Sequence, residues 1–149
     1  MEAVILMGIQ GSGKSTFFRQ RLFDTHVRIN LDMLKTRRRE KLLLEACLAA
    51  GQSFAVDNTN PARADRARYI PAARAAGFRV IGYFFHSDIQ ECHKRNRQRE
   101  GKKLIPYGGL LGALGRLEMP SLDEGFDELY RVKVAPDGGF IVEPWAESP

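Results

Sequence analysis

Ala3 to Ser15 reads AVILMGIQGSGKS, and these residues decide the fold that the rest of the chain completes. The run from Ala3 to Met7 is apolar throughout, which is typical of a strand buried on both faces of a parallel sheet. The remainder follows the pattern GxxxxGKS, whose glycines let backbone N–H groups close around an anion. We therefore predict a central strand, a phosphate-binding loop and a helix that starts at Ser15.

Strands and helices are predicted to alternate beyond this stretch. Apolar runs predict strands at 27–29, 54–57 and 80–85, and helical spacings predict helices at 15–22, 34–51, 60–77 and 88–101. In the third helix, Asn60 is the expected cap, Pro61 lies in the first turn and Gly77 is the stop. Alternation of this kind forms βα units, so the fold class is α/β, with a doubly wound parallel sheet flanked by helices.

The last third of the chain has a weaker pattern. Leucines between residues 110 and 117 indicate a helix, although neighbouring glycines lower its helical propensity. Residues 129–134 and 140–142, around Asp137-Gly138-Gly139, predict a hairpin. A chain of 149 residues, 44% of them hydrophobic, is expected to form one domain over residues 1–149.

Composition also excludes several classes of protein. No apolar stretch approaches the roughly 20 residues of a membrane span, and the first residues are too short and uncharged a run for a secretory leader, so we expect a cytoplasmic protein. Cys47 and Cys92 lack any metal-ligand spacing and are expected to be reduced thiols. The three histidines form no metal motif.

The formal net charge is +5, and much of it comes from two arginine clusters. These are Arg37 to Arg39 and the alternate arginines from Arg95 to Arg99. Clustered arginines indicate a polyanionic partner. The alternative is that both clusters are simply solvated helix faces, which is common for charge runs.

The phosphate loop supplies a cation and a hydroxyl. Lys14 would bind the phosphates, and Ser15 would hold Mg²⁺ while the new helix directs its positive dipole end at the anion. Asp57 ends the third predicted strand, from which a carboxylate can reach the same metal. The alternative is that Asp57 to Asn60 form only a polar turn.

Asp32 follows the second predicted strand, as the last residue of Ile29-Asn30-Leu31-Asp32. The carboxyl ends of parallel strands lie at one edge of the sheet, so Asp32 should open a helix on the same edge as the phosphate loop. An aspartate is ionised at neutral pH and could accept a proton from an attacking hydroxyl. The alternative role is a plain helix N-cap.

Arg95 and Arg99 are four residues apart, so they would share one face of a helix. Two guanidinium groups in this arrangement could clamp a phosphate and stabilise the charge of a transferred phosphoryl group. The alternative is that cations in the last turn only complement the helix dipole before Gly101 ends the helix.

Taken in order, these features resemble the kinase domain of the 5′-hydroxyl polynucleotide kinases, which occur in phage and animal nucleic-acid repair enzymes. The resemblance spans residues 4 to about 132. It is carried by these segments: Gly8 to Thr16, Ile29 to Asp32, Asp57 to Pro61, Arg66 to Tyr69, Arg95 to Glu100, Ile105-Pro106 and Leu122 to Phe126. A phosphate loop alone is common to very many proteins, whereas the ordered set is much more specific.

The resemblance implies a P-loop kinase-like sheet with a helical lid at about residues 92–105, and ATP and Mg²⁺ as cofactors. Asp32 would be the general base, Lys14 would hold the phosphates, and Arg99 would reach ATP from the lid with Arg95 beside it. The expected nucleotide-binding residues are Gly8, Gly11, Ser12, Gly13, Lys14, Ser15, Thr16, Arg95 and Arg99, and the expected metal ligands are Ser15 and Asp57.

Lys35 and Arg38 are the expected substrate-binding residues. The phage-type pattern places an arginine three residues after the base, where this chain has Lys35. A lysine offers a point charge in place of a bidentate fork, which weakens the case for a strict 3′-phosphate contact. The chain has no DxD phosphatase motif, so a phosphatase or ligase would be a separate partner.

The predicted function is ATP-dependent transfer of the γ-phosphate to the 5′-OH end of DNA or RNA. The first alternative is a small-molecule kinase of the same architecture that acts on a nucleoside, sugar or antibiotic hydroxyl. The second is a nucleotide-dependent binding module without catalysis. The absence of an NKxD motif from the sequence argues against a GTPase switch.

Overall fold

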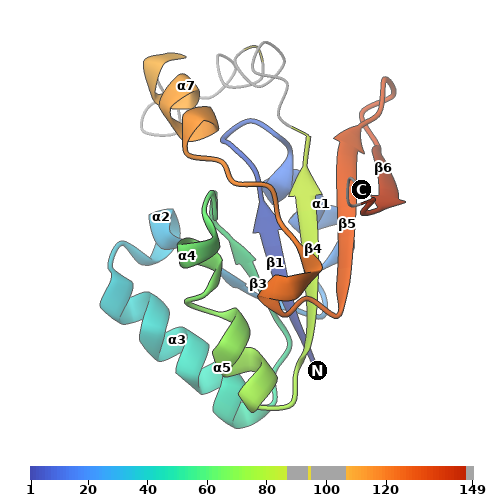
Figure 1. Cartoon of the computed structure of the whole chain (residues 1–149). Helices are drawn as coiled ribbons and strands as arrows, with labels where there is room; N and C mark the ends of the chain where they lie inside the picture. Colours follow the sequence, from blue (N-terminus) through green and yellow to red (C-terminus); the bar gives the residue numbers. More distant parts are fainter. Residues whose placement is uncertain (87–93, 95–106, 147–149) are drawn as a thin grey trace.

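The computed structural model describes residues 1–86, 94 and 107–146, and these residues contain a six-stranded sheet (Figure 1). Its strands are β1 (Glu2–Met7), β2 (Val27–Ile29), β3 (Phe54–Asp57), β4 (Arg79–Phe85), β5 (Glu128–Val134) and β6 (Phe140–Pro144). The spatial order is β2-β3-β1-β4-β5-β6. The first five strands in this order are parallel and β6 pairs antiparallel with β5, so β1 lies inside the sheet as its sequence predicts.

Helices cover both faces of this sheet. They are α1 (Lys14–Arg21), α2 (Leu31–Leu34), α3 (Arg37–Ala50), α4 (Arg63–Arg66), α5 (Ile70–Ala75), α7 (Tyr107–Gly115) and the 3₁₀ helix η2 (Leu122–Glu124). Side chains alternate along β1: Val4 and Leu6 pack with Phe17 of α1, whereas Ile5 packs with Leu44 of α3 on the other face. The sheet is therefore doubly wound, and the predicted fold class is confirmed.

One predicted helix is divided in two. The region predicted as 34–51 contains the end of α2 and then α3, separated at Lys35, whose φ of 75° is unusual for a residue other than glycine. Thr36 then caps α3, because its hydroxyl accepts a hydrogen bond from Arg39 N at 3.1 Å. Gly51 ends α3 in the left-handed conformation, as predicted.

The prediction of one helix over 60–77, capped by Asn60, is wrong. Asn60 has a φ of 47°, and its side-chain amide donates to Leu6 O at 2.8 Å, so it anchors the loop to the end of β1. Helix α4 begins only after Ala62, and a second helix, α5, follows with Pro71 in its first turn. Because proline lacks an N–H, it starts a helix more readily than it continues one.

Arg66, on α4, is completely buried. It forms two hydrogen bonds with the Glu124 carboxylate, at 2.7 and 3.1 Å, and it also donates to the backbone carbonyls of Asn60, Pro61 and Glu118. This side chain ties α4 to η2 and to the loop after β3. The short helices between β3 and β4 are thus fixed by long-range contacts that helical propensity does not encode.

Of the remaining predicted elements, two are confirmed and one falls mostly outside the described residues. The hairpin is confirmed as β5 and β6, and the weakly predicted helix in the last third is confirmed as α7. The predicted helix at 88–101 lies outside the described residues apart from Lys94. Within the described ranges, no helix is both long and apolar enough to cross a membrane.

Candidate functional site

The phosphate loop connects β1 to α1 at the carboxyl end of the sheet (Figure 1). Gly8, Gly11 and Gly13 have φ angles of 148°, 82° and 103°, a region that side chains rarely adopt. A Cβ atom on Gly8 would also lie 2.9 Å from Ser12 Oγ and 3.0 Å from Phe85 Cβ. The loop geometry therefore requires glycine at these positions, which explains the pattern in the sequence.

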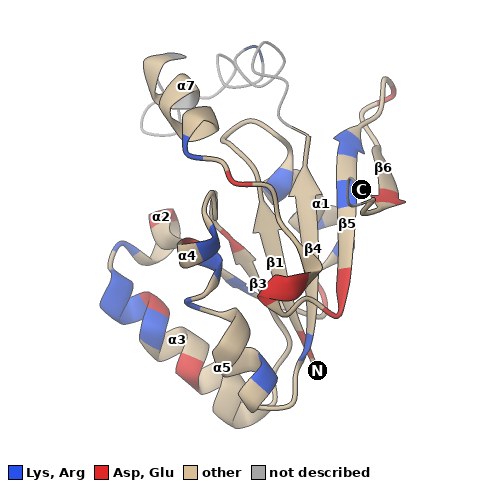
Figure 2. Cartoon of the chain, viewed as in Figure 1, with Lys and Arg blue, Asp and Glu red and all other residues tan. Residues whose placement is uncertain are grey.

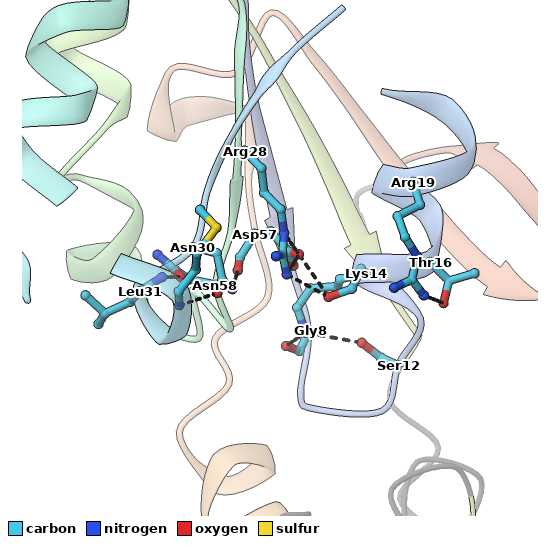
Figure 3. A network of polar contacts seen from close by, with 12 residues as sticks. Gly8, Ser12, Lys14, Thr16, Arg19, Arg28, Asn30, Leu31, Asp57 and Asn58 are labelled. Atoms are coloured by element: carbon cyan, nitrogen blue, oxygen red, sulfur yellow. Dashed lines mark hydrogen bonds and ion pairs between the residues drawn. The ribbon is translucent and has the colours of Figure 1, made fainter. Parts of the chain in front are cut away.

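Lys14 lies inside this loop and is only 8% exposed. Its ammonium group donates to Gly8 O at 2.6 Å and to Ile9 O at 3.0 Å, and it approaches the buried Ser12 Oγ at 3.5 Å (Figure 3). Thr16, in the first turn of α1, accepts a hydrogen bond from Arg19 at 3.4 Å. The loop thus places a compact cation beside backbone N–H groups at the start of a helix, the usual composition of a phosphate site.

Ser15 and Asp57, the two predicted metal ligands, contact each other at the end of β3. Ser15 Oγ donates to Asp57 Oδ2 at 2.9 Å, and the Asp57 carboxylate is 2% exposed. Arg28 also binds this carboxylate: its Nε lies 2.9 Å and its Nη2 2.8 Å from Oδ2 (Figure 3). The hydroxyl and the carboxylate therefore form one cluster with a guanidinium.

Arg28 is a site residue that the sequence reasoning missed. It lies on β2 in register with Ala55 of β3, and Asp57 is two residues farther along β3, so Arg28 and Asp57 face the same side of the sheet. The one available signal was a charged residue in the middle of the short run Val27-Arg28-Ile29. The contact between Arg28 and Asp57 can be inferred only once the pairing of β2 with β3 is known.

Asp32 lies in the first turn of α2 and is exposed. It is not the helix cap, because Asn30 Oδ1 accepts a hydrogen bond from Met33 N at 2.9 Å, whereas Asn30 Nδ2 donates to Asp57 O at 2.6 Å. Leu31 N donates to Asn58 Oδ1 at 2.9 Å. The turn that carries Asp32 is therefore fastened directly to the end of β3, and the alternative reading of Asp32 as an N-cap is excluded.

A buried polar network around Glu40 holds Asn58, which in turn binds the start of α2. The Glu40 carboxylate, 4% exposed, accepts hydrogen bonds from Asn58 Nδ2 at 3.0 Å, Tyr69 Oη at 3.1 Å and Arg37 Nη1 at 2.8 Å. Burial, together with the nearby Glu40 charge, raises the pKa of Tyr69 to about 12, so its hydroxyl stays protonated and remains a donor. Through Asn58, this network fixes the start of α2 relative to β3.

Basic residues cluster along the chain where α2 passes into α3 (Figure 2). Lys35 and Arg38 are exposed, and each lies within a few residues of Asp32 in the sequence. Arg37 pairs with Glu40, and Arg39 donates to Leu34 O at 3.3 Å. Arg95 and Arg99, with the predicted lid, lie outside the described residues, so their predicted roles stay predictions.

The fold and the phosphate loop together define a P-loop nucleotide-binding protein with the architecture of the P-loop kinases. The chain belongs to the AAA domain family, whose model matches residues 4–107. It is also 29% identical over 136 residues to the bifunctional polynucleotide phosphatase/kinase of Schizosaccharomyces pombe. That match covers 88% of this chain and 33% of the relative, so the chain spans about a third of the relative's length.

Solved structures share the fold at lower identity. A gluconokinase from Sinorhizobium meliloti 1021 superposes with a TM-score of 0.62 at 22% identity, covering 90% of this chain and 83% of that one. Kti12 from Chaetomium thermophilum, solved in complex with ADP-AlF3, superposes with a TM-score of 0.63 at 16% identity, covering 88% of each chain. Both likenesses establish the α/β P-loop architecture.

Proposed function

We propose that this protein transfers the γ-phosphate of ATP to the 5′-OH end of a nucleic acid strand. The observation that carries the proposal is the placement of Asp32: an exposed carboxylate on a short turn that Asn30 and Asn58 hold against the end of β3, at the edge of the sheet where the phosphate loop also begins. The likeness to the Schizosaccharomyces pombe bifunctional polynucleotide phosphatase/kinase supports the choice of acceptor.

The nucleotide would be held by the loop that runs from Gly8 to Thr16. Lys14 would turn from the carbonyls that it now contacts toward the phosphates, and the N–H groups at the start of α1 would donate to them. Ser15 Oγ and an Asp57 carboxylate oxygen, 2.9 Å apart, fit Mg²⁺, which prefers oxygen ligands. Mg²⁺ bound there would neutralise charge on the β- and γ-phosphates.

In the transfer step, Asp32 would accept the proton of the 5′-hydroxyl as that oxygen forms a bond to the γ-phosphorus. The bond between the γ-phosphorus and the bridging oxygen of ADP breaks, and ADP leaves with the electron pair. Positioning and charge stabilisation supply most of the acceleration in such reactions. Arg95 and Arg99, from the lid at about 92–105, are proposed to stabilise the transferred phosphoryl group.

The basic residues at the α2–α3 junction would contact the strand that follows the 5′ end. Lys35 and Arg38 are exposed and follow Asp32 closely in the sequence, and the exposed Arg39 adds a third charge. A protein that engages about three phosphates of a single strand should bind with a log–log salt slope of about −2. Alanine at Lys35, Arg38 and Arg39 together should flatten that slope, and alanine at the exposed Arg79, at the amino end of β4, should leave it unchanged.

The acceptor is tested by incubation with γ-labelled ATP and Mg²⁺. The acceptors are 5′-OH DNA and RNA oligonucleotides, the same oligonucleotides with a 5′-phosphate, free nucleosides and gluconate. We expect label only at 5′-OH oligonucleotide ends. Label on nucleosides or gluconate alone would replace the proposal with a small-molecule kinase, and nucleotide binding without transfer to any acceptor would replace it with a binding module.

A further inference from the structure

A single guanidinium contacts both residues that the site offers to a metal, at Ser15 Oγ and at one carboxylate oxygen of Asp57. Asp57 Oδ2 receives Ser15 Oγ at 2.9 Å, Arg28 Nε at 2.9 Å and Arg28 Nη2 at 2.8 Å. The same Nη2 lies 3.2 Å from Ser15 Oγ. Arg28 therefore spans the hydroxyl and the carboxylate at once, as the dashed contacts in Figure 3 show.

The burial of the two partners is unequal. The Asp57 side chain is 2% exposed, whereas the Arg28 side chain is 31% exposed. A carboxylate that deep requires a compensating positive charge, because an isolated buried charge is strongly disfavoured. Arg28 supplies that charge, and its partial exposure leaves the guanidinium a route toward solvent.

Two cations cannot hold these oxygens at the same time. Mg²⁺ binds oxygen at about 2.0–2.1 Å with near-octahedral geometry, which leaves no space on Asp57 Oδ2 for two guanidinium nitrogens. A divalent and a monovalent cation at that separation would also repel each other in a poorly solvated site. Metal and Arg28 would therefore compete for Ser15 Oγ and Asp57 Oδ2.

We propose that Arg28 gates the metal side of the nucleotide site. In the nucleotide-free protein the guanidinium stands in for the divalent cation, and loading of the nucleotide with Mg²⁺ releases it from Ser15 and Asp57. The inference rests on the proposed Mg²⁺–nucleotide site and is independent of which acceptor receives the phosphate. Arg28 sets how much Mg²⁺ the site needs before nucleotide binds tightly.

The test titrates Mg²⁺ at a fixed concentration of a fluorescent ADP and follows binding, with an EDTA arm. Arg28→Gln removes the charge and keeps a side chain of moderate length, and Arg28→Lys keeps a charge that cannot span both oxygens. Arg79→Gln is the matched control, since Arg79 is a strand arginine paired with Glu128 at the opposite end of the sheet, at 3.0 Å. Thermal unfolding is recorded with and without Mg²⁺–ADP.

We expect Arg28→Gln to reach half-maximal ADP binding at an Mg²⁺ concentration at least threefold lower than the wild type needs. The Mg²⁺ concentration for Arg28→Lys should lie between these two values, and that for Arg79→Gln should match the wild type. Arg28→Gln should also melt lower alone and gain more from Mg²⁺–ADP. An unchanged Mg²⁺ requirement would make Arg28 a structural counter-ion, and weaker ADP binding at saturating Mg²⁺ would make it a phosphate ligand. Either result overturns the gate.

If Arg28→Gln does not fold, Arg28→Lys decides by the same criterion. Wild-type protein that binds no ADP at any Mg²⁺ concentration would instead overturn the nucleotide site of the proposed function. The binding assay contains no acceptor, so it cannot be confused with failure of phosphate transfer to a 5′-OH end.

Discussion

The two ends of the sheet use the same kinds of residue in opposite ways. At the carboxyl ends of the strands, Asp57 and Lys14 are buried, and Arg28 reaches into the same cluster. At the other end, Arg79–Glu128 and Arg74–Asp127 are ion pairs whose members are 33–55% exposed. The charged groups at the carboxyl ends are mostly shielded from solvent and pair with one another or with the backbone. The ion pairs at the amino ends lie on the surface.

This difference shows at which end of the sheet polar groups carry a cost in folding free energy. Exposed pairs contribute little to folding, with typical values of about 0–1 kcal/mol. Buried charges cost several kcal/mol in desolvation and are retained only when hydrogen bonds compensate them. A cluster of compensated buried charges at one end of a sheet is therefore a better guide to a functional site than the number of exposed ion pairs.

The largest effect should come from removing the buried cation of the loop. Lys14→Ala removes the point charge that would face the nucleotide phosphates, and turnover should fall on the order of 10²–10³-fold or more. The measurement is phosphate transfer under saturating ATP, with circular dichroism as the folding control. Arg79→Ala, at an exposed position at the amino end of β4, should keep full turnover; equal losses in the two variants would erase the distinction between the ends of the sheet.

The next largest effect should come from Glu40. Glu40→Ala leaves Asn58, Tyr69 and Arg37 without their shared acceptor, so we expect the free energy of unfolding to fall by about 2–3 kcal/mol. Denaturant titration measures this loss. Glu45→Ala, on the same helix, breaks only the exposed contact with Lys41 at 4.0 Å and should change stability by less than about 0.5 kcal/mol.

The same network should also affect catalysis. Because Asn58 fastens the turn that carries Asp32, Glu40→Gln, which keeps one acceptor, should lower turnover several-fold while leaving ADP binding unchanged. A variant that loses stability but keeps wild-type turnover would restrict Glu40 to a structural role.

Tyr69 offers a test through pH. Its folded pKa of about 12 lies above the ordinary value of 10, so the stability that its protonated hydroxyl contributes is complete below pH 10 and is lost as pH rises toward 12. Tyr69→Phe should cost about 1 kcal/mol at pH 8, and the gap to wild type should shrink above pH 10. A gap that is constant with pH would contradict the buried-donor assignment.

The smallest effect is expected at the amino ends of the strands. Arg79→Gln removes an exposed pair with Glu128 and touches no buried polar group, so the melting temperature and the turnover should both match those of the wild type. Thermal unfolding and the transfer assay measure both quantities. A clear loss of turnover would mean that this end of the sheet contributes to function after all.

The parts of the fold that the sequence predicts are those encoded locally. The loop from Gly8 to Ser15 needs glycine at positive φ and an apolar strand before it, and both are visible in consecutive residues. Asp57 was predictable for the same reason, as the residue that ends an apolar strand. The hairpin of β5 and β6 followed from a turn between two apolar runs.

The parts that were missed depend on contacts between distant residues. Arg28 needs the register of β2 on β3 before it meets Asp57. Asn60 was expected as a helix cap because asparagine favours caps, but its amide is used by Leu6 O, on β1. Glu40 sits within an arginine-rich segment that looks solvated, and only the packing of Tyr69 against α3 buries it.

The most direct test of the central claim compares Asp32→Asn with Asp24→Asn in single-turnover phosphate transfer to a 5′-OH oligonucleotide, with ADP binding measured alongside. Asp24 is an exposed aspartate in the turn after α1 and matches the change in charge. We predict that Asp32→Asn binds ADP like the wild type and transfers about 10²–10⁴-fold more slowly, whereas Asp24→Asn is unaffected. Wild-type transfer by Asp32→Asn would contradict the assignment of this carboxylate as the base, and with it the account of the site.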